Sequence, residues 1–216
     1  MKDAMDTDDT ARPPGVILAG GRARRLGGGD KPLCLLTGQT RIIDQVIARI
    51  APQLGALAIN ANGDKARLAG FGLPVLPDSL ADHPGPLAGV LAAMDWAAAR
   101  GASSVITVAG DTPFLPRDLV ARLCAAAPGG GVVLAASPDA EGALRRHPTC
   151  GLWPVALREG LRADLGAGMR KVALWADRQG AAAVAFPAQP VDPFFNINTA
   201  EDLARARAIL AGGLQD

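Results

Sequence analysis

Short apolar runs alternate along the chain with longer segments in which apolar residues recur every three or four positions. The short runs cover residues 15–18, 56–60, 105–108 and 132–136, and Gly, Pro or polar residues bound them. Continuous apolar runs of this length are typical of buried strands. The longer segments, around 42–50, 87–94 and 119–123, have the spacing of helices, and Pro116 favours the start of the third. This alternation predicts a parallel sheet covered by helices on both faces.

After residue 137 the pattern is less regular. Further strands are expected at 149–153 and 183–186, and helices at 155–165 and 170–178. Thr199 is expected to cap a C-terminal helix, because Asp202 follows three residues later and favours the first turn. Neither a fixed-period repeat nor a linker of domain-separating length is present. We therefore expect a single α/β domain over residues 15–216, preceded by a flexible acidic tail at residues 1–14.

Composition excludes several classes of protein. The 216 residues are 49% apolar and 20% charged, which excludes disordered chains, collagen and disulfide scaffolds. The longest apolar segment, near 87–99, is interrupted by Asp95 and falls short of the ~18 residues that a membrane span needs. The first residues are acidic and lack the apolar core of a secretion signal. These features predict a cytoplasmic protein that does not enter a membrane.

The cysteines and histidines do not indicate a metal centre or a disulfide framework. Cys34, Cys124 and Cys150 are odd in number and far apart, and His83 and His147 are too few and too separated for a zinc site. We expect the thiols to be reduced and buried, as free cysteines usually are.

Charge is balanced overall but uneven locally. The formal charge of +1 argues against binding to nucleic acid through overall charge. Residues 1–10 carry one Lys and four Asp, a net charge of −3, whereas residues 22–31 carry three Arg and one Lys against Asp30, a net charge of +3. The positive cluster follows the first predicted strand directly, and an anionic partner is expected there.

The segment from Leu18 to Pro32 leaves the first strand through Gly20 and Gly21 and continues through three further glycines to Lys31. Glycines allow backbone N–H groups to approach phosphate oxygens, and Arg and Lys add positive charge. Ligands of open α/β sheets bind at the carboxyl ends of strands. The segment therefore has the chemistry of a phosphate-binding loop, with a solvated basic turn as the alternative.

Two common phosphate-binding loops do not match. A P-loop would have Ser or Thr after its lysine, whereas Pro32 follows Lys31. A dinucleotide-binding loop would have the spacing G-x-G-x-x-G and an acidic residue at the end of the second strand, which here ends at Asn60.

Asp111 lies just beyond the predicted strand at 105–108, in a turn rich in Gly and Pro. A carboxylate at this position can hold Mg²⁺ against phosphates, since Mg²⁺ prefers one or two carboxylates together with phosphate oxygens and water. The alternative is a turn or N-cap aspartate, which is a common role.

Taken in order, several segments resemble the molybdenum cofactor guanylyltransferase family. They are LAGGRARRLGGGDKPL, NANGD, PVLPDSLADHPGPLAGV, VAGDTPFLP, RHPT and NINTAEDLA, and together they span about Gly15 to Leu203. The first segment alone would indicate only the wider nucleotidyltransferase superfamily, and DSLADHPGPLAG and NINT make the resemblance more specific. The resemblance implies a Rossmann-like three-layer α/β fold and Mg²⁺-dependent transfer of GMP from GTP to molybdopterin bearing molybdenum, with release of pyrophosphate.

The resemblance also implies roles for individual residues. The nucleotide and its phosphates would be lined by Leu18, Ala19, Gly20 and Gly21, and the triphosphate would be held by Arg25 and Lys31. Asn60 and Asp78 would contribute to guanosine binding, and Asp111 would bind Mg²⁺. The pterin substrate or the metal would lie near Gly85, Gly89, Asn196 and Asn198. Catalysis would be assigned to Arg25, Lys31 and Asp111. Proteins that insert molybdenum or accept the finished cofactor are compatible with the family, but no segment identifies them.

The chain departs from the family pattern before Asp111. Family members often carry a run with Cys and Pro there, whereas this chain has Ala109 and Gly110. Related alternatives are a molybdopterin cytidylyltransferase, whose members more often carry LAAG where this chain has LAGG, and a sugar-phosphate nucleotidyltransferase. A third alternative is a nucleotide-binding module without catalytic activity.

Overall fold

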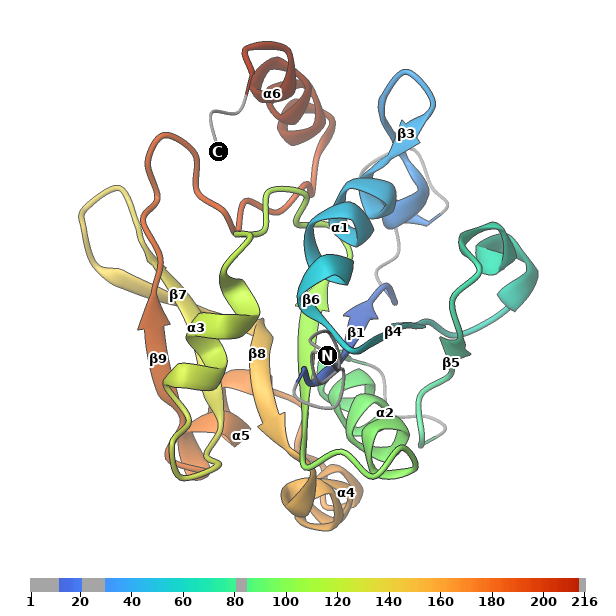
Figure 1. Ribbon diagram of the computed structural model, residues 1–216, viewed down its shortest axis with the longest axis vertical. Coiled ribbons are helices and arrows are strands. Elements are labelled where there is room, and N and C mark those ends of the chain that lie inside the picture. Colours follow the sequence, from blue (N-terminus) through green and yellow to red (C-terminus); the bar gives the residue numbers. More distant parts are fainter. Residues whose placement is uncertain (1–11, 21–29, 81–84, 214–216) are drawn as a thin grey trace, which may run out of the picture.

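The structure, a computed structural model, describes residues 12–20, 30–80 and 85–213. Its main sheet has seven strands in the order β5-β4-β1-β6-β8-β7-β9 (Figure 1). These strands are β1 (Pro14–Leu18), β4 (Ala56–Asn60), β5 (Val75–Leu76), β6 (Ser104–Ala109), β7 (Val133–Pro138), β8 (Leu144–Pro154) and β9 (Ala182–Ala185). A two-stranded hairpin is formed by β2 (Leu35–Thr37) and β3 (Thr40–Arg41).

The described helices are α1 (Ile42–Ile50), α2 (Pro86–Ala98), α3 (Leu119–Ala125), α4 (Arg158–Gly166), α5 (Val172–Arg178) and α6 (Ala200–Ala211). Four 3₁₀ turns accompany them: η1 (Lys31–Leu33), η2 (Ala51–Gln53), η3 (Lys65–Phe71) and η4 (Val155–Leu157). The predicted α/β fold with a mainly parallel central sheet is confirmed. The expected tail falls mostly on residues 1–11, which lie outside the described residues, whereas Pro14 already belongs to β1.

Strand β1 lies at the centre of the parallel part of the sheet. It pairs in parallel with β4 and β6, and Leu18 is in register with Asn60 on one side and Ala109 on the other. The carboxyl ends of the three strands therefore meet at one edge of the sheet. Residues that follow these strands, however distant in sequence, are brought to the same place.

Alternating side chains of β1 face two separate cores. Ile17 packs with residues of α1 and α3, and Val16 packs with residues of α2, α4 and α5. These helices form the two outer layers seen around the sheet in Figure 1. Strands buried on both faces need apolar residues at successive positions, which explains the continuous apolar runs of the sequence.

Two features of the fold were not expected from the pattern. Strand β8 is antiparallel to β6 and β7 and runs over eleven residues, more than twice the predicted 149–153. The β2–β3 hairpin lies outside the main sheet, and α6 packs on it through a small cluster that includes Leu36, Ile197 and Ala206. Arg207 of α6 adds hydrogen bonds to the carbonyls of Leu35 and Leu36, each 3.0 Å long.

The cysteines only partly match the expectation of buried thiols. Cys150 is buried and Cys34 is half-buried, but Cys124 is exposed on α3, so the expectation is wrong for that residue. Burial raises the pKa of the Cys150 thiol to about 12, which keeps it protonated at neutral pH. None of the helices in the described parts of the chain is long and apolar enough to cross a membrane.

Candidate functional site

Three strand ends supply the floor of the candidate site. The N–H of Ala19 donates to the carbonyl of Asn60 (2.8 Å), and the N–H of Gly110 donates to the carbonyl of Leu18 (3.0 Å). These bonds extend the pairing of β1 with β4 and β6 by one residue each. Ala19 is buried, and Gly20 emerges at the surface next to it. Gly21 and Arg25, predicted to contact the nucleotide, lie outside the described residues.

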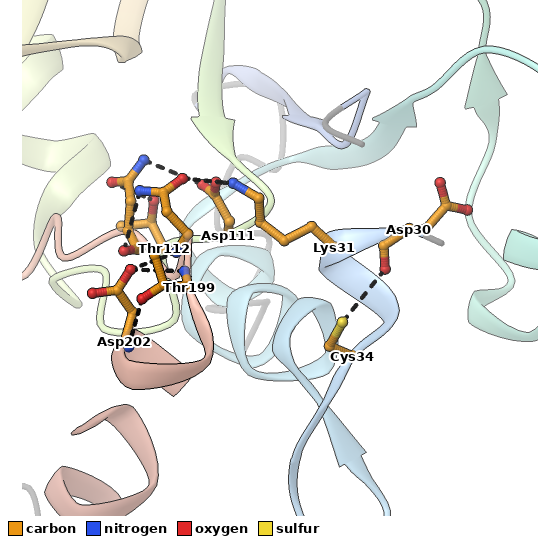
Figure 2. Close-up of polar contacts among 9 residues, drawn as sticks. Asp30, Lys31, Cys34, Asp111, Thr112, Thr199 and Asp202 are labelled. Atoms are coloured by element: carbon orange, nitrogen blue, oxygen red, sulfur yellow. Dashed lines mark hydrogen bonds and ion pairs between the residues drawn. The ribbon is translucent and has the colours of Figure 1, made fainter. Parts of the chain in front are cut away.

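Lys31 and Asp111 meet across this edge of the sheet (Figure 2). The Nζ atom of Lys31 lies 2.7 Å from Oδ2 of Asp111 and also donates to Oδ1 of Asn198 at 2.7 Å. Only 13% of the Lys31 side chain and 17% of the Asp111 side chain are exposed. Lys31 begins the turn η1, with Pro32 next to it to favour that turn, and Asp111 follows β6.

The segment 196–199 holds its asparagines against Asp111. Its backbone is tied to the site because the N–H of Ile197 donates to the carbonyl of Asp111 at 3.0 Å. The Nδ2 atom of Asn196 donates to Oδ1 of Asp111 at 3.3 Å. Thr199 and Asp202 form a capping box at the start of α6, and Asp202 Oδ2 also accepts the N–H of Asn198 at 2.9 Å. The predicted N-cap is therefore confirmed, and it orients the asparagine segment.

A second cluster lies around Asp78, beyond the end of β4. Nδ2 of Asn60 donates to Oδ1 of Asp78 at 3.0 Å, and Nδ2 of Asn62 donates to Oδ2 at 2.7 Å. The backbone N–H of Asp78 returns a bond to Oδ1 of Asn62 at 2.9 Å. Two amides thus fix the plane of the carboxylate, while each of its oxygens keeps a further lone pair for a ligand.

Gly89 of α2 packs directly on this cluster. A Cβ atom added there would lie 2.4 Å from Oδ1 of Asn60 and 3.0 Å from Cδ2 of Leu18. The helix can approach the strand end this closely only because residue 89 has no side chain. Gly85, at the N-cap of the same helix, has a φ of +133°, a conformation that favours glycine. The structure therefore places Gly89 against the Asn60 cluster.

The donor set around Asp111 fits Mg²⁺. The Asp111 carboxylate and the amide oxygen of Asn198 both accept from Lys31 Nζ, and Mg²⁺ accepts such oxygen ligands together with phosphate oxygens and water. Asn196 instead turns its Nδ2 atom towards Asp111. Within the described ranges, no group of three or more His, Cys, Asp or Glu side chains gathers to form an all-protein metal site. An ion at Asp111 would therefore complete its coordination with substrate oxygens and water.

A pocket of about 460 Å³ opens next to the asparagine segment. Its lining includes Asn196, Asn198 and Asp202 from the C-terminal part of the chain and Arg145, Arg146 and Thr149 from β8. The two arginines are paired, Arg145 with Asp192 at 3.2 Å and Arg146 with Asp177 at 2.5 Å. The pocket thus combines two arginines and two aspartates, Asp192 and Asp202, with amide groups, and it borders the Lys31–Asp111 pair through Asn196 and Asn198.

Ser137, His147 and Asp192 form a hydrogen-bonded chain at the wall of this pocket, in which Ser137 and His147 are buried and Asp192 is half-buried. Ser137 Oγ donates to Oδ1 of Asp192 at 3.0 Å and lies 2.7 Å from Nε2 of His147. Since a carboxylate only accepts and Ser137 has a single hydroxyl proton, both hydrogen bonds form together when Ser137 donates to Asp192 and Nε2 of His147 donates to Ser137. The carboxylate of Asp192 contacts Ser137 and not the imidazole, so the order of the trio differs from that of a nucleophilic triad, in which the carboxylate orients the histidine.

The imidazole of His147 stacks on Phe194 with ring centroids 4.4 Å apart. Burial is the main cause that lowers its pKa to about 4; Arg145 lowers it further, whereas Asp192 opposes the shift. His147 is therefore neutral at pH 7, and it supports the segment that leads into Asn196.

Comparison with known proteins agrees with this geometry. The family model for the MobA-like NTP transferase domain matches residues 15–184. A molybdenum cofactor guanylyltransferase of Bradyrhizobium sp. (strain ORS 278) is 50% identical over 212 residues, which cover 96% of this chain and 97% of the relative. The enzyme of the same name from Nitrobacter hamburgensis is 49% identical over 204 residues, covering 92% and 96%. The chain belongs to the molybdenum cofactor guanylyltransferase family.

A solved structure shows the same fold at lower sequence identity. Molybdopterin-guanine dinucleotide biosynthesis protein A from Archaeoglobus fulgidus superposes with a TM-score of 0.69 at 23% identity, covering 92% of this chain and 99% of that one. At this identity the similarity concerns the fold alone. The resemblance read from the motifs is thus confirmed at the level of family and fold, whereas the roles of individual residues stay predictions.

Several residues that shape the site were missed in the sequence. Asn62 contacts Asp78 beside Asn60. Its place two residues after Asn60 in the NAN motif could have indicated that both asparagines lie at the end of the same strand. The contacts of Arg67 with Asp30 and of Ser137 with Asp192 gave no such signal, because the two residues of each pair lie 37 and 55 residues apart in the chain.

Proposed function

We propose that this chain transfers GMP from GTP to molybdopterin bearing molybdenum, forming the guanine dinucleotide form of the cofactor and releasing pyrophosphate. The proposal includes a requirement for Mg²⁺ and a location in the cytoplasm. The observation that carries it is the contact of Lys31 with both Asp111 and Asn198 at the carboxyl ends of β1 and β6. A cation and a carboxylate held together there suit a site that gathers phosphates and a divalent ion.

The chemistry needs positioning and charge neutralisation more than a protein base. The terminal phosphate of the acceptor is already an anion at pH 7, so one of its oxygens can form the new bond to the α-phosphorus of GTP. The bond from that phosphorus to the bridging oxygen breaks, and the electron pair leaves with pyrophosphate. Bound Mg²⁺ would neutralise phosphate charge and orient the oxygens. No proton has to be removed from the nucleophile, which suits a site without a nucleophilic triad.

Each described residue has a distinct task in this proposal. Lys31 would neutralise the triphosphate as the leaving group gains charge, and Asp111 would hold the ion. Asp78, oriented by two amides, would accept hydrogen bonds from the donor edge of guanine. Leu18, Ala19 and Gly20 would border the nucleotide at the end of β1. Arg25 keeps its predicted role at the triphosphate.

The acceptor would bind in the pocket of about 460 Å³ next to Asn196 and Asn198. The guanidinium groups of Arg145 and Arg146 would donate hydrogen bonds to the acceptor in addition to those they give Asp192 and Asp177, and the asparagine amides would direct its phosphate towards Asp111. Family membership is the basis for including, as partners, proteins that supply molybdenum or accept the product.

The decisive experiment supplies GTP, CTP, Mg²⁺ and molybdenum-loaded pterin to the purified protein. Mass spectrometry of the product and pyrophosphate release are the two measurements. We expect the guanine dinucleotide, with no product when Mg²⁺ is chelated. A cytosine product would support the cytidylyltransferase alternative, and GTP binding without pyrophosphate release would support a catalytically idle module.

A further inference from the structure

Arg67 of η3 donates hydrogen bonds to three separate groups. Its Nε atom donates to Oδ2 of Asp30, one terminal nitrogen donates to the carbonyl of Asp64, and the other donates to the carbonyl of Asn62 at 2.9 Å. The Arg67 side chain is 24% exposed and that of Asp30 is 27% exposed. The planar guanidinium offers donors in several directions at once, which an ammonium group on a flexible stem does not reproduce.

One end of this connection leads to the phosphate side of the candidate site. Asp30 immediately precedes Lys31 and is the N-cap of η1, where its carbonyl accepts the N–H of Leu33 at 3.0 Å. A carboxylate held by Arg67 therefore fixes the start of the turn that carries Lys31. The structure supplies no other salt-bridge partner for Asp30 among the described residues.

The other end leads to the base side. Asn62, whose carbonyl accepts from Arg67, holds Asp78 through two reciprocal hydrogen bonds of 2.7 and 2.9 Å. Asp64 belongs to the same connection, since its side chain caps η3 by accepting the N–H of Ala66. The turn that follows β4 is thus held by hydrogen bonds within the turn and by hydrogen bonds from Arg67 to its carbonyl groups.

We propose that Arg67 is a positioning residue that sets the separation between Lys31 and Asp78, and so tunes the site to a nucleotide whose base and triphosphate must both be bound. Arg67 acts through Asp30 and Asn62 and does not contact the nucleotide. The proposal rests on the proposed function in one respect, that Lys31 binds phosphate and Asp78 binds the base. Asn62 is a local partner, 5 residues from Arg67, whereas Asp30 is 37 residues away, so only the folded chain joins the phosphate side to the base side.

The test compares binding of whole GTP with binding of its two parts. Calorimetry would measure GTP, and guanosine and pyrophosphate would be measured separately by NMR titration. We expect Arg67→Gln to weaken GTP binding about tenfold, in keeping with loss of hydrogen bonds to a charged group. Binding of guanosine and of pyrophosphate should change less than twofold, because each half of the site remains intact.

Two further variants separate positioning from simple loss of stability. Arg67→Lys keeps the charge beside Asp30 but cannot serve all three acceptors, so GTP binding should stay weakened. In a double-mutant cycle, Asp30→Asn and Arg67→Gln should be strongly non-additive, since they break one connection. The matched control is Arg122→Gln at a half-buried arginine of α3 that also bonds a backbone carbonyl, pairs with a carboxylate and stacks on Phe186, and that makes no contact with the described residues of the site.

Each outcome bears on a different claim. Unchanged GTP affinity in Arg67→Gln, or full recovery in Arg67→Lys, would overturn the positioning role. Equal weakening by Arg67→Gln and Arg122→Gln would also overturn it, because the effect would then be one of general stability. A wild-type protein that binds no GTP at all would instead overturn the proposed function, before any variant is made.

Discussion

Lys31 and Asp111 are 80 residues apart in the sequence, and their charged atoms lie 2.7 Å apart in the structure. Each side chain is mostly buried, so water and salt screen the attraction between the two charges less than they screen a surface salt bridge. The pair connects the loop that leaves β1 with the turn that ends β6. It is the contact on which the first two predictions depend.

Replacement of Lys31 by Ala should lower the rate constant of GMP transfer about 10²–10³-fold at saturating substrates. Loss of one preorganised charge at the site of reaction typically costs roughly 3–4 kcal/mol of transition-state stabilisation. Steady-state kinetics of pyrophosphate release would measure the change. Lys171→Ala, at an exposed lysine before α5, is the matched control and should behave as wild type. Turnover of Lys31→Ala at the wild-type rate would refute the catalytic role.

Replacement of Asp111 by Asn should raise the Mg²⁺ concentration needed for half-maximal activity and lower the maximal rate. The amide keeps the shape of the carboxylate but removes its charge, which weakens binding of a hard divalent cation. It also removes the ionic partner of Lys31. A Mg²⁺ titration of activity would measure the effect. If the titration curve of the variant coincided with that of the wild type, Asp111 would be a turn residue only.

Replacement of Gly89 by Ala should destabilise the protein by about 1–3 kcal/mol, as expected for overpacking. The added Cβ would lie 2.4 Å from Oδ1 of Asn60, so Asn60 would be displaced and its bond to Asp78 lost. We therefore expect a raised KM for GTP together with a lowered melting temperature. Gly160→Ala in α4 is the matched control, because nothing lies within 4 Å of the new methyl group.

The two glycine variants should differ in their free energy of unfolding. Ala is favoured over Gly inside a helix by about 0.5–1 kcal/mol, so Gly160→Ala should be neutral or stabilising. Thermal unfolding of both variants would show whether the cost at residue 89 comes from contact with Asn60. A Gly89→Ala protein as stable as the wild type, with normal GTP binding, would contradict the close packing described here.

Stability should fall on acidification because of His147. Its pKa is about 4 in the folded protein against an ordinary value of 6.5. As the pH falls, His147 of the unfolded chain therefore takes up its proton at a higher pH than His147 of the folded protein, which favours unfolding. The contribution of His147 is complete above pH 6.5 and is lost as the pH falls towards 4, amounting to about 3 kcal/mol over the whole window. Denaturant unfolding at pH 7 and at pH 5 would measure it.

The control for this prediction is His147→Gln, which cannot titrate in this window. The free energy of unfolding of the variant should decline less than that of the wild type between pH 7 and pH 5. Parallel declines would show that the acid sensitivity arises from other groups. His83, the second histidine, is present in both proteins and so does not affect the difference.

Much of the fold could be predicted because it depends on local pattern. The apolar runs at β1, β4 and β6 and the helical spacing at α1 and α2 were recognisable, since strands buried on both faces must be apolar throughout. The direction of β8 could not be predicted in this way. Apolar periodicity is the same for parallel and antiparallel pairing, and the choice depends on how the preceding connection returns to the sheet.

The sequence by itself determined the chemistry available to this protein: a glycine-rich basic loop after the first strand, an aspartate after a later one, and asparagines ahead of a capped helix. Only the tertiary structure decided which of these groups meet. Parallel pairing of β1 with β4 and β6 aligns the strand ends, and this brings Lys31 to Asp111 and Asn60 to Asp78. Contacts such as that of Arg67 with Asp30 join segments distant in the chain, and side chains become neighbours there only after the backbone has packed.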